Sequence, residues 1–376
     1  MLGYFLVLLS LLVSKSLYYE TFGENYLLLF TVLILLLILI FNGAYSRLKF
    51  SKGSIIGLIV VVLSVVVNFS FALTTVSVFI TALYAAFLLR TLVSYKSFAL
   101  KFFRIVNVLM CFSLLRYLVI IFSLDSSLPD FISIEGDHYK NFVFFGVLKT
   151  QTTYFQLLRN NGLWWEPGAF QVIINLSYIF GLSLDMINKR YFILYFVIIL
   201  STFSTAGFLV FAMLSIIFVR RNFSIATGML IILISVPFIL FSGFYNEVIG
   251  SKVNLDHGST LSRFNDSMLA LRIFVENPFF GIGLGNVDSI DVYTRRYDYG
   301  TGSNGILLLF SYLGIFAFFI FFYLAVPAYL VYFRNKFERV IVAISFILIF
   351  FSQNFIIILI FSILIVYGFR RYSSSS

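Results

Sequence analysis

The sequence has little of the charge and almost none of the cysteine on which soluble and secreted proteins rely. Only 11% of its 376 residues are charged, against about 25% in a soluble globular protein. The single cysteine, Cys111, cannot form an internal disulfide, and no His/Cys cluster has metal-site spacing. The GxxxxGK[ST] motif is also absent. These absences exclude a disulfide-stabilised domain, a zinc module and a P-loop ATPase.

Long apolar runs take up most of the chain, which is 61% hydrophobic with a mean hydropathy of +1.03. A membrane-spanning helix needs about 20 mostly apolar residues. Twelve apolar segments can be drawn, at 2–19, 26–42, 54–70, 74–93, 104–123, 167–187, 191–203, 207–219, 225–244, 304–333, 339–351 and 354–369. The short pair 191–203 and 207–219 can also be read as one broken span. We predict an all-α polytopic membrane protein with about 12 transmembrane helices, forming a single domain over 1–376.

The distribution of charge predicts the orientation. With the N-terminus in the cytoplasm, the predicted inner loops and the tail hold 16 of the 26 basic residues, as expected for short cytoplasmic loops. They are Arg47, Lys49, Lys52, Arg90, Lys96, Lys101, Arg104, Lys189, Arg190, Arg220, Arg221, Arg334, Lys336, Arg339, Arg370 and Arg371. Two long loops, about 124–166 and 245–303, then lie outside and hold 12 of the 16 acidic residues. The net charge of +10 is therefore a topology signal and not a nucleic-acid footprint, and both termini are expected in the cytoplasm.

The two long outer loops are the expected place of the functional site, because the other connections are minimal and leave no room for an inner soluble domain. In the second loop, apolar residues recur at spacings of three and four, which predicts an amphipathic helix at the outer interface. The stripe is Leu261, Phe264, Met268, Leu271 and Val275. Arg263 and Arg272 lie on the other face, where they can simply be solvated. In "NPFFGIGLGN", Gly281, Gly283 and Gly285 alternate; no strand precedes them, so we expect a tight re-entrant turn and no dinucleotide site.

The first loop ends in "LLRNNGLWWEPGAFQ", which contains both tryptophans of the chain. Tryptophans at a membrane surface are commonly interfacial anchors, and this is one reading of Trp164 and Trp165. Pro167 suits the first position of a helix, so Glu166 would stand at the helix N-terminus and can be a cap. Arg116 lies inside a predicted span, where an ionisable residue is either functional or directed to the interface.

These stretches together resemble a known family. An arginine followed by "GLWWEPG", then "LSRF", "ENPFFGIGLGN" and "GSNGILLLFSYLGI" occur in the order found in the O-antigen and capsule polymerase/ligase superfamily. The resemblance is sharp over about 159–175 and 259–314. It implies a GT-C-like integral membrane glycosyltransferase that acts on undecaprenyl-diphosphate-linked oligosaccharides at the outer face of the bacterial inner membrane. Ligases of this superfamily have a histidine before the asparagine that corresponds to Asn304; its absence here favours a Wzy-type polymerase.

The resemblance also implies roles for residues. Arg159 and Arg263 would stabilise the diphosphate leaving group, since no DxD motif stands in either outer loop to hold Mg²⁺. Glu166 would orient the acceptor hydroxyl or accept its proton, or else pair with an arginine. The other substrate-binding candidates are Arg272, Trp164, Trp165, Arg116 and Asn304. We expect no cofactor and no metal.

The expected partners are the lipid-linked oligosaccharide as donor and acceptor, the lipid bilayer and a chain-length regulator protein; nucleic acid is not expected. Two other functions remain open. An O-antigen ligase would share the architecture, and a flippase or transporter for the same lipid-linked oligosaccharide would also fit twelve spans. Transporters bind near the membrane midplane with internal repeats, whereas the polar residues here gather in the outer loops.

Overall fold

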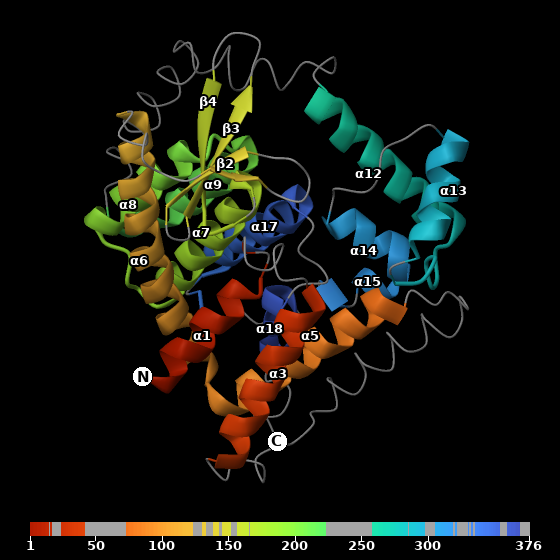
Figure 1. Ribbon diagram of the computed structural model, residues 1–376, viewed down its shortest axis with the longest axis horizontal. Coiled ribbons are helices and arrows are strands. Elements are labelled where there is room, and N and C mark those ends of the chain that lie inside the picture. The colour runs from red at the N-terminus through yellow and green to blue at the C-terminus, as the bar shows by residue number, and fades with distance from the viewer. Residues whose placement is uncertain are drawn as a thin grey trace.

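Figure 1 shows the computed structural model, a mostly helical protein with one small sheet. The structure describes residues 1–14, 16, 24–41, 73–122, 130–132, 138–142, 145–151, 156–164, 166–222, 258–284, 286–297, 305–318, 320–321, 330, 332–333, 335–353 and 359–368. The helices are α1 (Leu2–Leu12), α3 (Glu24–Phe41), α5 (Leu73–Leu92), α6 (Tyr95–Ile121), α7 (Pro167–Ser183), α8 (Lys189–Ser201), α9 (Thr205–Asn222), α12 (Gly258–Glu276), α13 (Val287–Tyr297), α14 (Gly305–Leu313), α15 (Phe316–Phe318), α17 (Lys336–Ser352) and α18 (Leu359–Gly368).

Within these residues, three helical segments are long and apolar enough to cross a membrane: Thr75–Leu92, Tyr95–Ile121 and Thr205–Asn222. Shorter apolar helices accompany them, among them α1 and α7. The expectation of a helical membrane protein is confirmed at this coarse level. The predicted segments 54–70 and 225–244 lie outside the described residues, so the count of about twelve and the GT-C-like architecture stay predictions.

The first long loop contains a feature that the all-α prediction did not include. Four antiparallel strands follow one another as neighbours in the order β1-β2-β3-β4. They are β1 (Asp130–Ile132), β2 (His138–Phe142), β3 (Phe145–Gln151) and β4 (Gln156–Gly162). Hairpins of this kind form by pairing between neighbouring strands, which no single short segment reveals in its own periodicity. The last strand, β4, packs against α6, α7 and α8 and so connects the sheet to the helical bundle.

The stretch 191–219 forms two helices and not one broken span. Helix α8 begins at the N-cap Asn188, whose side chain accepts a hydrogen bond from the Tyr191 N–H at 3.0 Å. It ends at Ser201, and residues 202–204 turn the chain into α9. The rings of Phe192 and Phe218 stack with centroids 4.7 Å apart. Because these residues lie at the start of α8 and near the end of α9, the two helices run antiparallel.

Helix α7 is the central helix of the bundle. Residues 167–182 are all buried, as expected of a helix that is surrounded by others. Its few polar side chains bond to neighbouring helices: Gln171 donates to the Ser352 hydroxyl of α17 at 3.0 Å. Asn175 donates to the Gln171 side chain at 3.0 Å and to the Gly207 carbonyl of α9 at 3.2 Å. Such bonds hold helices together where apolar packing gains little from excluding water.

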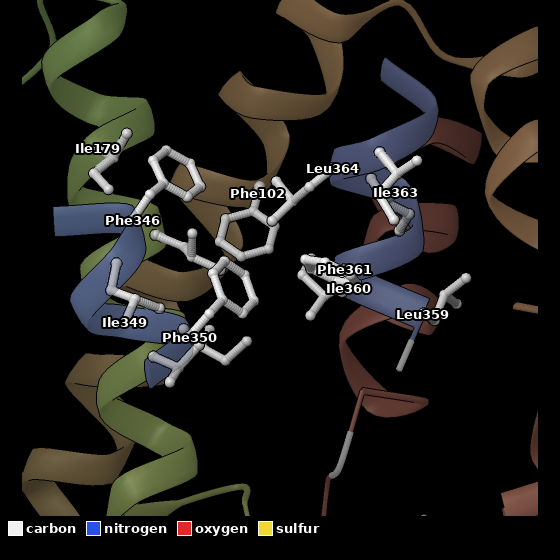
Figure 2. Packing of buried hydrophobic residues seen from close by; sticks show 14 of the residues in the cluster. Phe102, Ile179, Phe346, Ile349, Phe350, Leu359, Ile360, Phe361, Ile363 and Leu364 are labelled. Atoms are coloured by element: carbon white, nitrogen blue, oxygen red, sulfur yellow. The ribbon is translucent and has the colours of Figure 1, made fainter. Parts of the chain in front are cut away.

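The apolar core joins helices that are far apart in the sequence (Figure 2). Phe346 and Phe350 of α17 face Phe361 of α18, with the Phe350 and Phe361 rings 5.1 Å apart. Phe102 of α6 lies in the same cluster (Figure 2), and its ring meets the Phe180 ring of α7 edge to face at 5.0 Å. Aromatic pairs of this geometry contribute roughly 0.5–1.5 kcal/mol beyond their buried area.

The helix predicted in the second long loop is confirmed as α12. It ends at Glu276, two residues before Pro278. The predicted apolar stripe, however, is not the face that packs inside. Phe264 and Val275 are 52% and 73% exposed, whereas Leu269 and Ile273 are each 1% exposed. The buried face lies on α14, where the Ser311 hydroxyl donates to the Ala270 carbonyl at 2.9 Å. The outward apolar face suits contact with lipid.

The glycine stretch after α12 forms a tight turn against the end of α14. Gly281 and Gly283 have φ of 64° and 91°, which glycine adopts without strain. The N–H groups of Ile282 and Gly283 donate to the Ser311 and Tyr312 carbonyls at 2.9 and 3.1 Å. They thereby satisfy carbonyls at the C-terminal end of α14 that lack helical partners. The apolar segment 304–333 is also interrupted, since α14 ends at Leu313 and Gly314 has φ 59°.

Candidate functional site

Arg159 lies on β4, where it faces the turn between α8 and α9. In the register of the sheet it stands opposite Leu148 of β3. Its side chain is half-buried, and Nε donates to the carbonyl of Thr202 at 3.2 Å. This bond uses the inner nitrogen of the guanidinium. The α8–α9 turn, residues 202–204, therefore holds Arg159 through the inner nitrogen of its guanidinium. Arg159 is the arginine that we expect to stabilise the leaving group.

The next residue, Asn160, fixes β4 between two helices. Its Oδ1 accepts a hydrogen bond from the Ser113 hydroxyl of α6 at 2.5 Å and another from the Gly162 N–H at 3.1 Å. Its Nδ2 donates to the Ser201 hydroxyl at the end of α8, at 3.0 Å. Asn160 is 1% exposed. A buried amide with partners on three elements positions the neighbouring Arg159 closely, because moving β4 would break several bonds at once.

Arg116 belongs to the same region. It lies on α6 three residues after Ser113, and residues three apart are neighbours on a helix surface. It is 3% exposed. Tyr117 and Ile120 on the next turn of α6 form a small apolar cluster with Phe203 of the α8–α9 turn. Arg116 thus lies on α6 between Ser113, which bonds β4 beside Arg159, and Ile120, which packs on the α8–α9 turn that Arg159 also bonds.

Trp164 is enclosed by the protein. It is 1% exposed, its indole N–H donates to the Ser14 carbonyl at 3.0 Å, and its ring stacks on Phe170 with centroids 5.3 Å apart. A side chain enclosed in this way has no free face for a sugar ring in this conformation. Trp164 thus anchors the loop to α1 and α7, and the proposed sugar contact does not fit its placement. Trp165 lies outside the described residues.

Glu166 occupies the N-cap position of α7, with extended backbone angles of φ −142° and ψ 157°. The helix begins as predicted, with Pro167 in its first turn. The carboxylate, however, accepts no capping hydrogen bond from the helix. A cap made by the side chain is therefore not what this structure shows. A Cβ on Gly168 would lie 3.3 Å from Glu166 Oε1, which places the carboxylate beside the first turn of α7.

Gln353, which sequence reasoning missed, joins the two stretches that carry the family resemblance. It follows the end of α17 and is 8% exposed. A Cβ on Gly168 would collide with its side-chain amide, and a Cβ on Gly305 would collide with its backbone carbonyl. The N-termini of α7 and α14 therefore meet at Gln353. The only signal in the sequence is the polar break "SQN" between two apolar segments.

The remaining candidates are placed less closely to this junction. Arg263 lies in the first two turns of α12, and Arg272 is an exposed residue farther along the same helix. In Figure 1 the N-terminal end of α12 points toward the end of the molecule that carries β3 and β4. Asn304 lies outside the described residues, but Gly305 directly follows it and starts α14.

We call the region of Arg116, Arg159, Glu166 and Gln353 the β4–α7 site. Two of its residues are arginines, and two helix N-termini meet at Gln353. Both features favour an anion, since guanidinium pairs phosphate oxygens and helix N-termini carry partial positive charge. Glu166 adds a carboxylate that can accept a proton or orient a hydroxyl. Among the described residues, no group of three or more His, Cys, Asp and Glu side chains could hold a metal ion.

Comparison with known proteins gives this chain no relative. No protein-family model, curated protein or solved structure matches it. The functional assignment therefore depends on the sequence motifs and on the geometry of the β4–α7 site.

Proposed function

We propose that this protein polymerises undecaprenyl-diphosphate-linked oligosaccharide repeat units at the outer face of the bacterial inner membrane. The growing glycan would leave its lipid carrier and join the non-reducing end of the incoming unit. The observation that carries the proposal is the meeting of α7 and α14 at Gln353. It joins the start of "EPGAFQ" to the end of "GSNG", two of the motif stretches that resemble the O-antigen and capsule polymerase family.

The proposed reaction assigns a task to each group of the site. The bond between the anomeric carbon of the donor and its phosphate oxygen breaks, and undecaprenyl diphosphate departs with the electron pair. Arg159 and Arg263, with Arg116 nearby, would stabilise the negative charge that develops on this leaving group. A hydroxyl of the acceptor sugar forms the new glycosidic bond, and its proton passes to a base, for which Glu166 is our candidate.

A deletion strain tests the proposal against its alternatives. Loss of a polymerase leaves glycans of a single repeat unit on the cell surface. Loss of a ligase leaves long polymer on the lipid carrier, and loss of a flippase traps repeat units on the cytoplasmic side. The lipid-linked units extracted from the deletion strain then serve as the natural substrate for purified protein in detergent. A ladder of glycan lengths on a gel is the expected result; an unchanged single unit would contradict the proposal.

Arg159→Ala should abolish the ladder while the protein still inserts into the membrane. Loss of one electrostatic stabiliser of a leaving group typically lowers the rate about 10²–10³-fold. The matched control is Arg190→Ala, an exposed arginine at the opposite end of α8, which should keep the wild-type ladder. Normal chain lengths from Arg159→Ala would refute the role of Arg159, and the ladder assay on wild-type protein separates that result from failure of the proposed activity.

A further inference from the structure

A polar cavity lies at the end of the bundle where α1 begins and α5 passes into α6. Its volume is about 570 Å³. The side chains that line it include two cations and three hydroxyl groups, from Arg90, Lys101, Thr91, Ser94 and Ser97. None of the residues that line it in the described part of the chain is acidic. The proposed transferase reaction uses none of them.

The two cations of the cavity are held in place by the fold. Arg90 Nη1 donates to the Val366 carbonyl of α18 at 2.9 Å. Lys101 Nζ donates to the Ser97 hydroxyl one turn earlier on α6, and it lies 5.8 Å from the centre of the Tyr4 ring of α1. Gly3 leaves the room for this lysine, because a Cβ at Gly3 would come within 2.7 Å of Lys101 Cε. Positioned cations lose less conformational entropy on binding an anion than free surface lysines do.

The first turn of α6 adds further donors. Ser94 is the N-cap of α6, and its hydroxyl makes no capping bond to the helix. The N-terminal end of a helix favours anions, and here it opens beside Ser97 and Lys101. A cavity with this lining fits a phosphate ester, which presents several oxygen acceptors and negative charge.

The surroundings of the cavity indicate a lipid as the source of that phosphate. Helix α6 has 27 residues and is about 40 Å long, whereas the hydrocarbon layer is about 30 Å thick. Its basic first turns can therefore stand at the level of the headgroups. Helix α1, which carries Gly3, also has two exposed apolar side chains, Leu2 and Phe5, at 46% and 47% exposed. They point away from the face of Gly3 and give acyl chains an apolar surface on the outer side of α1.

We propose that this cavity binds the phosphate group of an anionic membrane lipid. The headgroup phosphate lies between Arg90 and Lys101 and accepts from Ser94 and Ser97, and the acyl chains run along the outer surface of α1. Basic pockets between transmembrane helices bind anionic headgroups by the same chemistry.

Native mass spectrometry of the purified full-length protein with dioleoylphosphatidylglycerol tests this site. Lys101→Gln should weaken lipid binding about five- to tenfold, since one cation near a phosphate contributes about that factor. Lys101→Arg should restore it. Lys96→Gln is the matched control, because Lys96 lies on the same turns of α6, is exposed and does not line the cavity; its affinity should stay that of the wild type. Gly3→Leu fills the cavity without removing a charge and should also lower lipid binding.

Two ligand controls identify what is bound. Dioleoylglycerol has the same acyl chains without phosphate and should bind at least tenfold more weakly. Glycerol 3-phosphate, added at the concentration of the lipid, should not displace it. The proposal is overturned if Lys101→Gln and wild type bind the lipid equally, or if dioleoylglycerol binds as well as the phospholipid. Displacement by glycerol 3-phosphate would assign the cavity to a soluble phosphate and overturn the lipid assignment.

Discussion

At the scale of single residues, Asn160 shows how a side chain to which the sequence motifs assign no role can position a functional one. It bonds Ser113 of α6, Ser201 of α8 and the N–H of Gly162, while its neighbour Arg159 bonds the turn that follows α8. The sequence made Arg159 a candidate through the family resemblance. It contains no sign of the role of Asn160, because the helical partners of this amide lie more than 40 residues away on both sides of β4.

Asn160→Ala should lower both the stability and the activity of the protein. The substitution removes the partner of the Ser113 hydroxyl and of the Gly162 N–H, and each buried polar group left unsatisfied costs about 1–3 kcal/mol. The Ser201 hydroxyl keeps its bond to the Ile198 carbonyl. We expect a clear fall in the midpoint of thermal unfolding, followed by intrinsic fluorescence in detergent, and loss of the glycan ladder.

The control for this substitution is Asn222→Ala, at the exposed end of α9. Exposed substitutions of this kind usually change stability by less than about 0.5 kcal/mol. Equal midpoints for Asn160→Ala and the wild type would show that the bonds around Asn160 add nothing to the fold.

At the scale of elements, the sequence predicted what periodicity and composition can show. The helices near 74–93, 167–187 and 339–351 and the helix in the second long loop were all expected, and the structure contains α5, α7, α17 and α12 there. The apolar stripe of α12 was expected at the outer interface, and the structure leaves Phe264 and Val275 exposed while Leu269 and Ile273 pack inside. Lipid and protein core are both apolar, so a stripe of Phe264, Leu271 and Val275 does not say which of them it faces.

Other elements could not be read, or were not read, from the sequence. The β1–β4 sheet depends on pairing between strands, and its segments lack a strong alternation of apolar and polar residues. Helix α13 had signals that can be recognised: Asn286 accepts from the Ser289 N–H at 3.0 Å, and Arg295 and Arg296 stand in its last turn. The junction at Gln353 joins Gly168 to a residue 185 positions away (353 − 168), which is a tertiary contact that no local pattern contains.

The junction at Gln353 predicts unequal effects for two glycine substitutions. At Gly305 a Cβ would collide with the backbone carbonyls of Phe350 and Gln353, which cannot move without shifting the end of α17. At Gly168 the first obstacle is the flexible end of the Gln353 side chain. Gly305→Ala should therefore abolish the ladder and shorten the thermal lifetime of the protein, because overpacking of this kind costs roughly 1–3 kcal/mol or more. Gly168→Ala should be mild.

A double variant tests whether the collision is the cause. Gly168→Ala combined with Gln353→Ala removes the obstacle at Gly168 and should restore the midpoint lost by Gly168→Ala. Gly305→Ala with Gln353→Ala should gain nothing, since the backbone of Gln353 is unchanged. The opposite ranking of the two glycines, measured by thermal unfolding and chain length, would contradict this account of the junction.

At the scale of the whole molecule, long-range contacts join segments that the charge pattern assigned to the same side of the membrane. At one end, Arg90 of α5 bonds α18 near its C-terminal end, and Tyr367 donates to the Val93 carbonyl at 2.7 Å. At the other end lie the Arg159 contact with the α8–α9 turn and the meeting of α7 and α14 at Gln353. The helices run between these two ends; which end faces the cytoplasm stays a prediction.

Helix α7 begins at the β4–α7 site and ends at an ion-pair network. It has 17 residues, so its two ends are about 25 Å apart. Arg221 of α9 donates to both carboxylate oxygens of Glu338 on α17, at 2.9 and 2.7 Å. It also donates to the Leu182 carbonyl of α7 and to Asp185, each at 2.8 Å. Because α17 contributes Glu338 at this end and Gln353 at the other, α7 and α17 run antiparallel and are tied at both ends.

Glu338→Gln should loosen this far end and lower the stability of the whole bundle. The Glu338 side chain is 3% exposed and that of Arg221 is 16% exposed, and breaking a pair buried to this degree costs about 3–5 kcal/mol. Asp185 and the Leu182 carbonyl still hold Arg221, so we expect a loss of about 2 kcal/mol, or about 2–3 °C in the apparent midpoint for a chain of this length. The measurement is the fraction of protein that still elutes as a single species after heating, since unfolding of such proteins is commonly irreversible.

Asp185→Asn is the matched control, because it removes the other carboxylate on the same guanidinium. The Asp185 side chain is 52% exposed, and an exposed ion pair contributes only about 0–1 kcal/mol. The midpoint should therefore fall clearly for Glu338→Gln and little for Asp185→Asn, and added salt should leave the difference largely unchanged, since screening acts mainly on exposed charges. Equal losses for the two variants would mean that Arg221 is held at the surface and does not couple α7, α9 and α17.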